Sequence, residues 1–203
     1  NKVIAIFFDT VWEHWANQGP QYYMLAQMAW NPYADGEAIL ADYYRRAFGP
    51  AAKTMTDYWT LMDDVSDDIL FNGKPAEEAW SADFYRQAYA YLDQAAEEVA
   101  GAPEVYAQRL AFVRAGLDFL RMYYENKALI ARLKKSDFND TEALETARAN
   151  WKQIVRILEE HPPAFNPMYV SATGSNSRAL AVNPDHQKAK EEEKTTVAQP
   201  GME

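Results

Sequence analysis

The chain has 203 residues, of which 48% are hydrophobic and 25% are charged, so it can form a folded core. Its net charge of −10 repels phosphate groups, which disfavours nucleic acids and anionic membrane surfaces as partners. The absence of cysteine excludes disulfides, thiolate metal sites and a cysteine nucleophile. No apolar run approaches the roughly 18 residues of a membrane-spanning helix.

A short apolar run, K-V-I-A-I-F-F at residues 2–8, is rich in β-branched and aromatic side chains. This pattern is typical of a strand that is buried on both faces of a parallel sheet. A lone strand cannot pair its own backbone groups, so we expect its partners in another chain or in a missing upstream part. The predicted fold class is therefore mainly α, with one N-terminal β-strand followed by a helical domain.

About six helices are predicted after this run, with ends marked by proline, glycine and capping residues. Their expected ranges are 19–30, 35–49, 50–71, 84–99, 106–124 and 144–161. Leu117 and Trp151 lie on apolar stripes of the last two, so we expect both in the core where these helices pack. The predicted division is a strand and loop at residues 1–18, a helical domain at 19–165 and a largely disordered tail at 166–203.

The loop that follows the run, residues 9–19, reads D-T-V-W-E-H-W-A-N-Q-G. Indole rings stack on the apolar faces of sugar rings, while carboxylates and amides hydrogen-bond to hydroxyls. We therefore predict that Glu13, His14, Trp15 and Gln18 bind a sugar. The alternative is that the tryptophan side chains pack the fold together and His14 is a core residue. Glu13 and His14 are adjacent and point apart, so no metal site is predicted here.

A second candidate is the acidic segment at residues 63–68, which contains a D-D-x-x-D pattern formed by Asp63, Asp64 and Asp67. Isoprenoid synthases use this spacing to hold magnesium and diphosphate, because acids one turn apart share a helix face. The alternative is a solvated acidic face near a helix end. No matching second acidic motif follows in the chain.

Four strings carry a resemblance to a known family: F-F-D-T at residue 7, E-H-W-A-N-Q-G-P-Q-Y-Y at residue 13, A-W-N-P at residue 29 and Y-Y-R-R-A-F-G-P-A-A at residue 43. Together they resemble the C-terminal part of bacterial proteins of the domain-of-unknown-function family 4838, over about residues 1–160. These proteins look like glycoside hydrolases, distantly similar to α-glucuronidases. The resemblance implies that residues 2–8 end an incomplete (β/α)8 barrel, that 9–19 form its top-face loop, and that the helices are an appended domain.

The function implied by the resemblance is that of a C-terminal fragment of a carbohydrate-active enzyme acting on a plant or algal polysaccharide or its oligosaccharides. Its expected partners are carbohydrate and the missing N-terminal barrel. No cofactor is expected. The resemblance also implies export to the periplasm or the medium. Glycosidases need two carboxyl groups, which we expect upstream, so the fragment alone should be inactive. The alternatives are a non-catalytic helical carbohydrate-binding or interaction module, and a magnesium-dependent isoprenoid-type enzyme.

Overall fold

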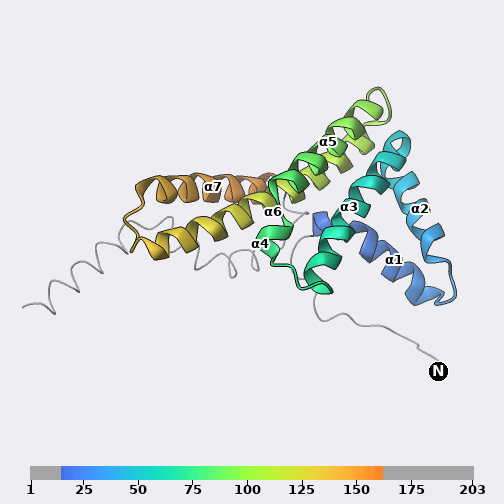
Figure 1. Ribbon diagram of the computed structural model, residues 1–203. Coiled ribbons are helices and arrows are strands. Elements are labelled where there is room, and N and C mark those ends of the chain that lie inside the picture. Colours follow the sequence, from blue (N-terminus) through green and yellow to red (C-terminus); the bar gives the residue numbers. More distant parts are fainter. Residues whose placement is uncertain (1–14, 162–203) are drawn as a thin grey trace, which may run out of the picture. The chain divides into compact units, whose positions relative to one another are not determined.

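The structure, a computed structural model, describes residues 15–161 (Figure 1). These residues form seven α-helices and two short 3-10 helices. The α-helices are α1 Gly19–Trp30, α2 Gly36–Phe48, α3 Ala52–Leu70, α4 Ala76–Ala79, α5 Ala82–Glu98, α6 Glu104–Lys135 and α7 Thr141–Glu160; the 3-10 helices are η1 Trp15–Asn17 and η2 Gly49–Ala51.

The predicted fold class, helices with one N-terminal β-strand, has to be corrected. Residues 15–161 contain helices and no β-strand, so this part of the chain is all-helical. The reason lies in backbone pairing: a strand needs a neighbouring strand, and none exists among residues 15–161. The apolar run at residues 2–8 and the predicted tail at 166–203 both lie outside the described residues.

Local chemistry explains where the first helices begin and end. The carboxylate of Asp35 accepts hydrogen bonds from the backbone amides of Glu37 at 2.9 Å and Ala38 at 3.3 Å, as the sequence predicts for a helix N-cap. Gly49 ends α2 with a φ of 53°, a conformation that favours glycine. Pro50 does not begin α3 directly, because it lies in η2, which precedes Ala52.

The described chain divides into two compact units, and the division falls within α6. In the first unit, α1 lies beside α2, α2 beside α3, and α3 beside α5 (Figure 1). Together with the first half of α6, the helices α2, α3 and α5 enclose a hydrophobic core. Its largest fully buried side chains are Trp59, Tyr58, Phe48, Met55, Leu92 and Leu117.

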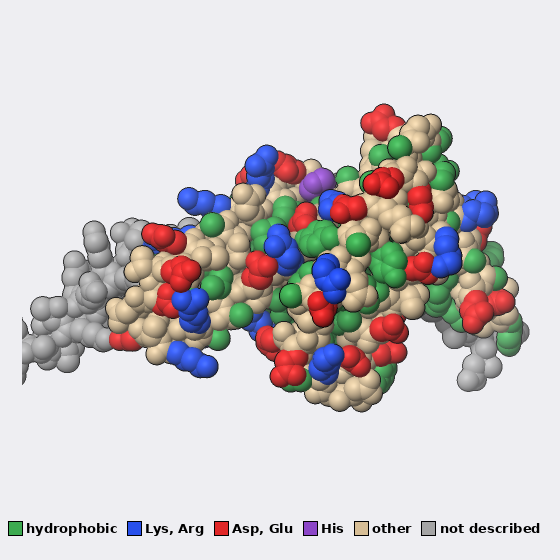
Figure 2. All heavy atoms as spheres, turned by 45° about the horizontal axis from the view of Figure 1, so that its top comes forward, with side chains coloured by type: hydrophobic (Ala, Val, Ile, Leu, Met, Phe, Trp, Pro, Cys, Tyr) green, Lys and Arg blue, Asp and Glu red, His purple; other side chains and the backbone are tan. Residues whose placement is uncertain are grey.

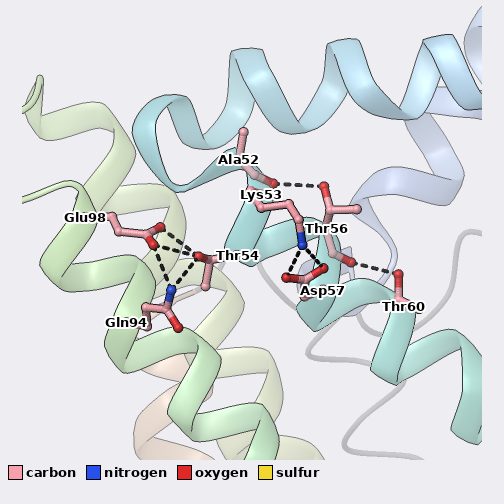
Figure 3. Close-up of polar contacts among 8 residues, drawn as sticks. All are labelled: Ala52, Lys53, Thr54, Thr56, Asp57, Thr60, Gln94 and Glu98. Carbon is pink, nitrogen blue, oxygen red and sulfur yellow. Dashed lines mark hydrogen bonds and ion pairs between the residues drawn. The ribbon is translucent and has the colours of Figure 1, made fainter.

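A polar contact at Thr54 joins α3 to α5 within this unit (Figure 3). The Thr54 side chain is buried, and its hydroxyl oxygen lies 2.8 Å from both carboxylate oxygens of Glu98. Gln94 donates from Nε2 to the same hydroxyl at 3.2 Å and to Glu98 at 2.9 Å. The buried Thr54 hydroxyl therefore both donates and accepts a hydrogen bond through side chains of α5, and it needs no bond to a backbone carbonyl of its own helix.

The second unit is formed by the second half of α6 and by α7. Asn126 is buried and donates from Nδ2 to the backbone carbonyl of Ala147 at 3.3 Å. Asp140 caps α7 by accepting a hydrogen bond from the backbone amide of Ala143 at 3.0 Å. Leu117 and Trp151 are both buried as predicted, but Leu117 belongs to the core of the first unit and Trp151 to the second unit.

The surface of the described residues is mixed in character. Figure 2 shows acidic, basic and hydrophobic side chains interspersed over the face in view. None of the helices in residues 15–161 has the length and hydropathy needed to cross a membrane.

Candidate functional site

A pocket of about 310 Å³ opens in the first unit. Its size lies at the lower end of the range of small-molecule sites, roughly 300–1,000 Å³. Side chains from η1, α1, α2 and the first half of α6 form its walls. The lining residues are Trp15, Ala16, Gly19, Tyr23, Tyr43, Arg46, Ala47, Phe48, Arg109, Phe112 and Val113.

The 3-10 helix η1 holds Trp15 at the pocket by docking on α6. Ala16 is buried, and the side-chain amide of Asn17 donates to the backbone carbonyl of Gly116 at 3.2 Å. A Cβ atom on Gly116 would lie 2.8 Å from the Cβ of Ala16, which is closer than real Cβ contacts. The glycine therefore permits η1 to rest directly on the α6 backbone, and Trp15 is positioned by this contact.

Tyrosine rings from α1 and α2 form one aromatic wall. The ring centroids of Tyr23 and Tyr43 lie 5.3 Å apart at an interplanar angle of 47°, and Tyr43 meets Phe48 edge-on at 6.0 Å. Gly19 gives Tyr43 its space, because a Cβ there would collide with the tyrosine hydroxyl. Burial raises the pKa of Tyr43 to about 12, so its hydroxyl remains protonated at neutral pH.

Asp42 organises the polar side chains next to this wall. Its carboxylate accepts a hydrogen bond from the Tyr23 hydroxyl at 2.9 Å and pairs with Arg45 at 2.5 Å and Arg46 at 2.6 Å. These contacts, with the Tyr23 hydrogen bond as the largest contribution, lower the pKa of Asp42. The same hydrogen bond raises the pKa of Tyr23, so at neutral pH an ionised carboxylate faces a neutral phenol.

Arg109 brings a second guanidinium group to the pocket from α6. Its Nη1 atom donates to the backbone carbonyls of Arg46 at 2.8 Å and Ala47 at 3.2 Å. These carbonyls belong to the last turn of α2, where cations are favoured by the helix dipole. Arg46 and Arg109 are the charged side chains among the lining residues, and none of those lining residues is acidic.

The four predicted sugar-binding residues are placed differently by the structure. Trp15 lines the pocket, as the sugar-site hypothesis requires. Gln18 precedes α1, and its side-chain oxygen accepts a hydrogen bond from the Tyr22 hydroxyl instead of lining the pocket. Glu13 and His14 lie outside the described residues.

The two arginine side chains of the pocket were not predicted from the sequence. Arg46 and Arg109 are separated by 63 positions, and only the folded chain brings them to one cavity. The signal available in the sequence was the R-R pair within the Y-Y-R-R string, next to tyrosine residues.

The acidic pattern on α3 does not form a metal site in the described part of the chain. Among residues 15–161, no group of three or more histidine, aspartate or glutamate side chains could hold a metal ion. Loss of hydration and the negative charges of Asp67 and Asp64 raise the pKa of Asp63. Asp68 pairs with Lys74 at 3.0 Å. The isoprenoid-type hypothesis therefore gains no support from these residues.

Comparison with protein families gives one match. Residues 1–60 match the model of a family described as Domain of unknown function (DUF4838). This stretch contains Trp15, Tyr23, Tyr43 and Arg46, whereas Arg109 lies beyond it. No curated protein and no solved structure matches the chain. The resemblance to DUF4838 is thus confirmed in the N-terminal 60 residues, which include most of the pocket.

Proposed function

We propose that this chain is part of a carbohydrate-active enzyme of the glycoside hydrolase type, and that its pocket binds a sugar ring. The observation that supports this proposal is the arrangement of Trp15, Tyr23 and Tyr43 around one cavity of small-molecule size. Aromatic faces pack against the C–H faces of sugar rings, while phenol hydroxyls and guanidinium groups hydrogen-bond to sugar oxygens. The substrate class is a plant or algal polysaccharide or its oligosaccharides, and the enzyme is exported.

The described residues contribute binding and not acid–base chemistry. Hydrolysis of a glycosidic bond needs two carboxyl groups that flank the bond. The lining residues include neither aspartate nor glutamate, and Asp42 is held by Tyr23 and two arginine side chains. We therefore assign the catalytic pair to residues outside the described part of the enzyme, with Glu13 as a hydroxyl ligand.

The test is calorimetric titration of the chain with xylose, glucose, galactose and mannose and their short β-linked oligomers. Trp15→Ala should weaken binding of the best sugar by about tenfold, because it removes the stacking plane. Trp30→Ala is the matched control, because Trp30 is 92% exposed and does not line the pocket. Absence of binding to every sugar, or equal binding by Trp15→Ala, would overturn the proposal.

A second candidate function is that of a non-catalytic binding or interaction module. Trp30 and Tyr33, at the turn between α1 and α2, are 92% and 95% exposed, and exposed aromatic side chains are typical of interaction surfaces. The same titration separates the two functions. Loss of sugar binding in Trp30→Ala with retention in Trp15→Ala would place the sugar on this turn and favour the module.

A further inference from the structure

The segment that joins α3 to α4 contains Asn72 followed by Gly73, and no other asparagine of the sequence is followed by glycine. Residues 71–75 are all exposed and none of them belongs to a helix; in Figure 1 they are the turn between α3 and α4. Gly73 has a φ of 69°, and a Cβ atom on it would meet no atom within 4 Å. The Gly73 backbone is therefore uncrowded directly beside the Asn72 side chain.

The backbone amide of Gly73 donates no hydrogen bond within residues 15–161. The amides on either side of it are paired. That of Asn72 donates to the carbonyl of Asp67 at 3.3 Å, and that of Lys74 donates to the carbonyl of Asp68 at 3.0 Å. An exposed and unpaired N–H group can lose its proton to hydroxide without first breaking a hydrogen bond of the fold. The Gly73 nitrogen is thus free to react.

From this arrangement we infer that Asn72–Gly73 is a self-modification site, at which the chain converts Asn72 into aspartate and isoaspartate. The deprotonated Gly73 nitrogen forms a bond to Cγ of Asn72 and closes a five-membered succinimide ring. The bond between Cγ and Nδ2 breaks, and this nitrogen takes up a proton from water and leaves as ammonia.

Hydrolysis of the ring completes the modification. The oxygen of a water molecule bonds to one of the two ring carbonyl carbons, the bond from that carbon to the ring nitrogen breaks, and the nitrogen takes up a proton. Attack at Cγ gives aspartate. Attack at the backbone carbonyl gives isoaspartate, in which the chain continues through the side chain. One water is consumed and one ammonia is released in total.

The fold and the sequence together favour Asn72 over other asparagine residues. The reaction is intramolecular, so its rate depends on how freely the nitrogen of the next residue reaches the side-chain carbonyl. Glycine has no Cβ to shield that nitrogen. Asn31 is also exposed, but the nitrogen of Pro32 carries no proton. Asn126 is buried within α6.

The modification should loosen the end of α3. Nδ2 of Asn72 donates to Oδ1 of Asp68 at 3.1 Å, and Oδ2 of Asp68 pairs with Lys74 at 3.0 Å. The hydrogen bonds from Lys74 and Asn72 lower the pKa of Asp68, so this carboxyl is ionised at neutral pH. A carboxylate at residue 72 would face it at a helix C-terminus, where negative charge is unfavourable. Isoaspartate also lengthens the backbone between the two amides that bond to the last turn of α3.

The experiment follows the purified chain during incubation, by peptide mass spectrometry with fragmentation that distinguishes isoaspartate from aspartate. The peptide with Asn72 should accumulate both products, and faster at mildly alkaline pH because the reacting amide must lose its proton. Asn31 and Asn126 in the same sample are internal controls and should react at least about tenfold more slowly, a barrier difference of about 1.4 kcal/mol. The modified chain should show faster amide hydrogen exchange at the end of α3.

Two variants test the mechanism. Gly73→Ala should slow the reaction at least about tenfold, because the methyl group shields the attacking nitrogen. Asn72→Gln leaves Gly73 in place and should give no product, because ring closure would need a six-membered ring. This second variant keeps the test valid if alanine at the positive φ of residue 73 prevents folding.

Three results would overturn the inference. Aspartate without isoaspartate would show direct hydrolysis of the side chain. Equal rates at Asn72 and Asn31 would remove the role of Gly73. A rate in the folded chain more than about a hundredfold below that in urea would show that the folded segment protects the site. Neither Asn72 nor Gly73 lines the pocket, and no sugar is used, so the result is independent of the proposed function.

Discussion

The side-chain amide of Asn17 and the backbone carbonyl of Gly116 are hydrogen-bonded at 3.2 Å, although 99 positions separate the two residues. This hydrogen bond joins η1, the short helix before α1, to the middle of α6. It helps to place Trp15 at the pocket, because Trp15 and Asn17 belong to the same short 3-10 helix. The geometry of the candidate site therefore depends on the absence of a side chain at residue 116.

Gly116→Ala should destabilise the protein by about 1–3 kcal/mol, because the new methyl group overlaps Ala16 and Asn17. This loss should exceed the gain of up to about 1 kcal/mol that alanine provides in a helix interior. Urea unfolding monitored by circular dichroism measures the difference. Gly36→Ala is the control: its Cβ would meet only Met24 at an ordinary 3.7 Å, so stability should be unchanged or slightly raised. A neutral Gly116→Ala would show that η1 does not dock on α6 in solution.

Thr54→Val should lower the free energy of unfolding by about 1–2 kcal/mol, because it removes the buried hydroxyl that joins Gln94 and Glu98. Thr60→Val makes the same chemical change on the same helix. Thr60 is exposed, and its hydroxyl donates to the backbone carbonyl of Thr56 at 3.0 Å, so its replacement should cost less than about 0.5 kcal/mol. Equal effects in denaturant melts would contradict the role assigned to Thr54.

Tyr43 should make stability sensitive to alkaline pH. Burial raises the pKa of Tyr43 from 10.0 to about 12 in the folded protein, so the folded state holds this proton more tightly than the unfolded state. The resulting stabilisation is fully present below pH 10 and is lost as the pH rises toward 12. Tyr43→Phe should therefore reduce the slope of stability against pH in this window. Denaturant melts at several pH values test this, with Tyr33→Phe, at a 95% exposed ring, as the control.

Trp151→Ala should cost about 3–5 kcal/mol, because the side chain is buried on α7 and its removal leaves a large cavity. Trp30→Ala removes the same side chain from a 92% exposed position and should change stability by less than about 0.5 kcal/mol. Thermal and denaturant melts compare the two. A cost below about 1 kcal/mol for Trp151→Ala would mean that α7 does not pack in solution as the structure describes.

Helix ends were predictable where a short-range signal determines them. Asp35 caps α2 through amides two and three residues away, and Gly49 ends the same helix through its own backbone conformation. The four residues of α4, Ala76–Ala79, were missed because a single turn is too short to show helical periodicity. Periodicity also predicted that Leu117 and Trp151 are buried, but it could not show that they belong to different units.

The candidate site was predictable only in part. Residue type indicated Trp15 as a sugar ligand; the structure places Trp15 at the pocket, and sugar binding there stays a prediction. Gln18 has the same chemical suitability but contacts Tyr22, because a local partner one turn away was available. Nothing in the sequence around Arg109 indicated a site residue. Arg109 lies beside Arg46 because α6 packs on α2, and a local sequence pattern cannot predict that packing. The predicted fold class was wrong for residues 15–161, which contain helices and no strand, while the run at residues 2–8 lies outside them.

Gly19 on α1 lies close to the Tyr43 hydroxyl on α2, so the residue types that are tolerated at these two positions should depend on each other. A side chain at residue 19 would collide with the Tyr43 hydroxyl, so a substitution at residue 19 should be accepted together with a change at residue 43, whereas Tyr43 can be replaced alone. Relatives that keep the phenol at residue 43 should keep the glycine at residue 19, and with both of them the aromatic wall. Relatives that lose the glycine should have a reshaped pocket and a different ligand preference.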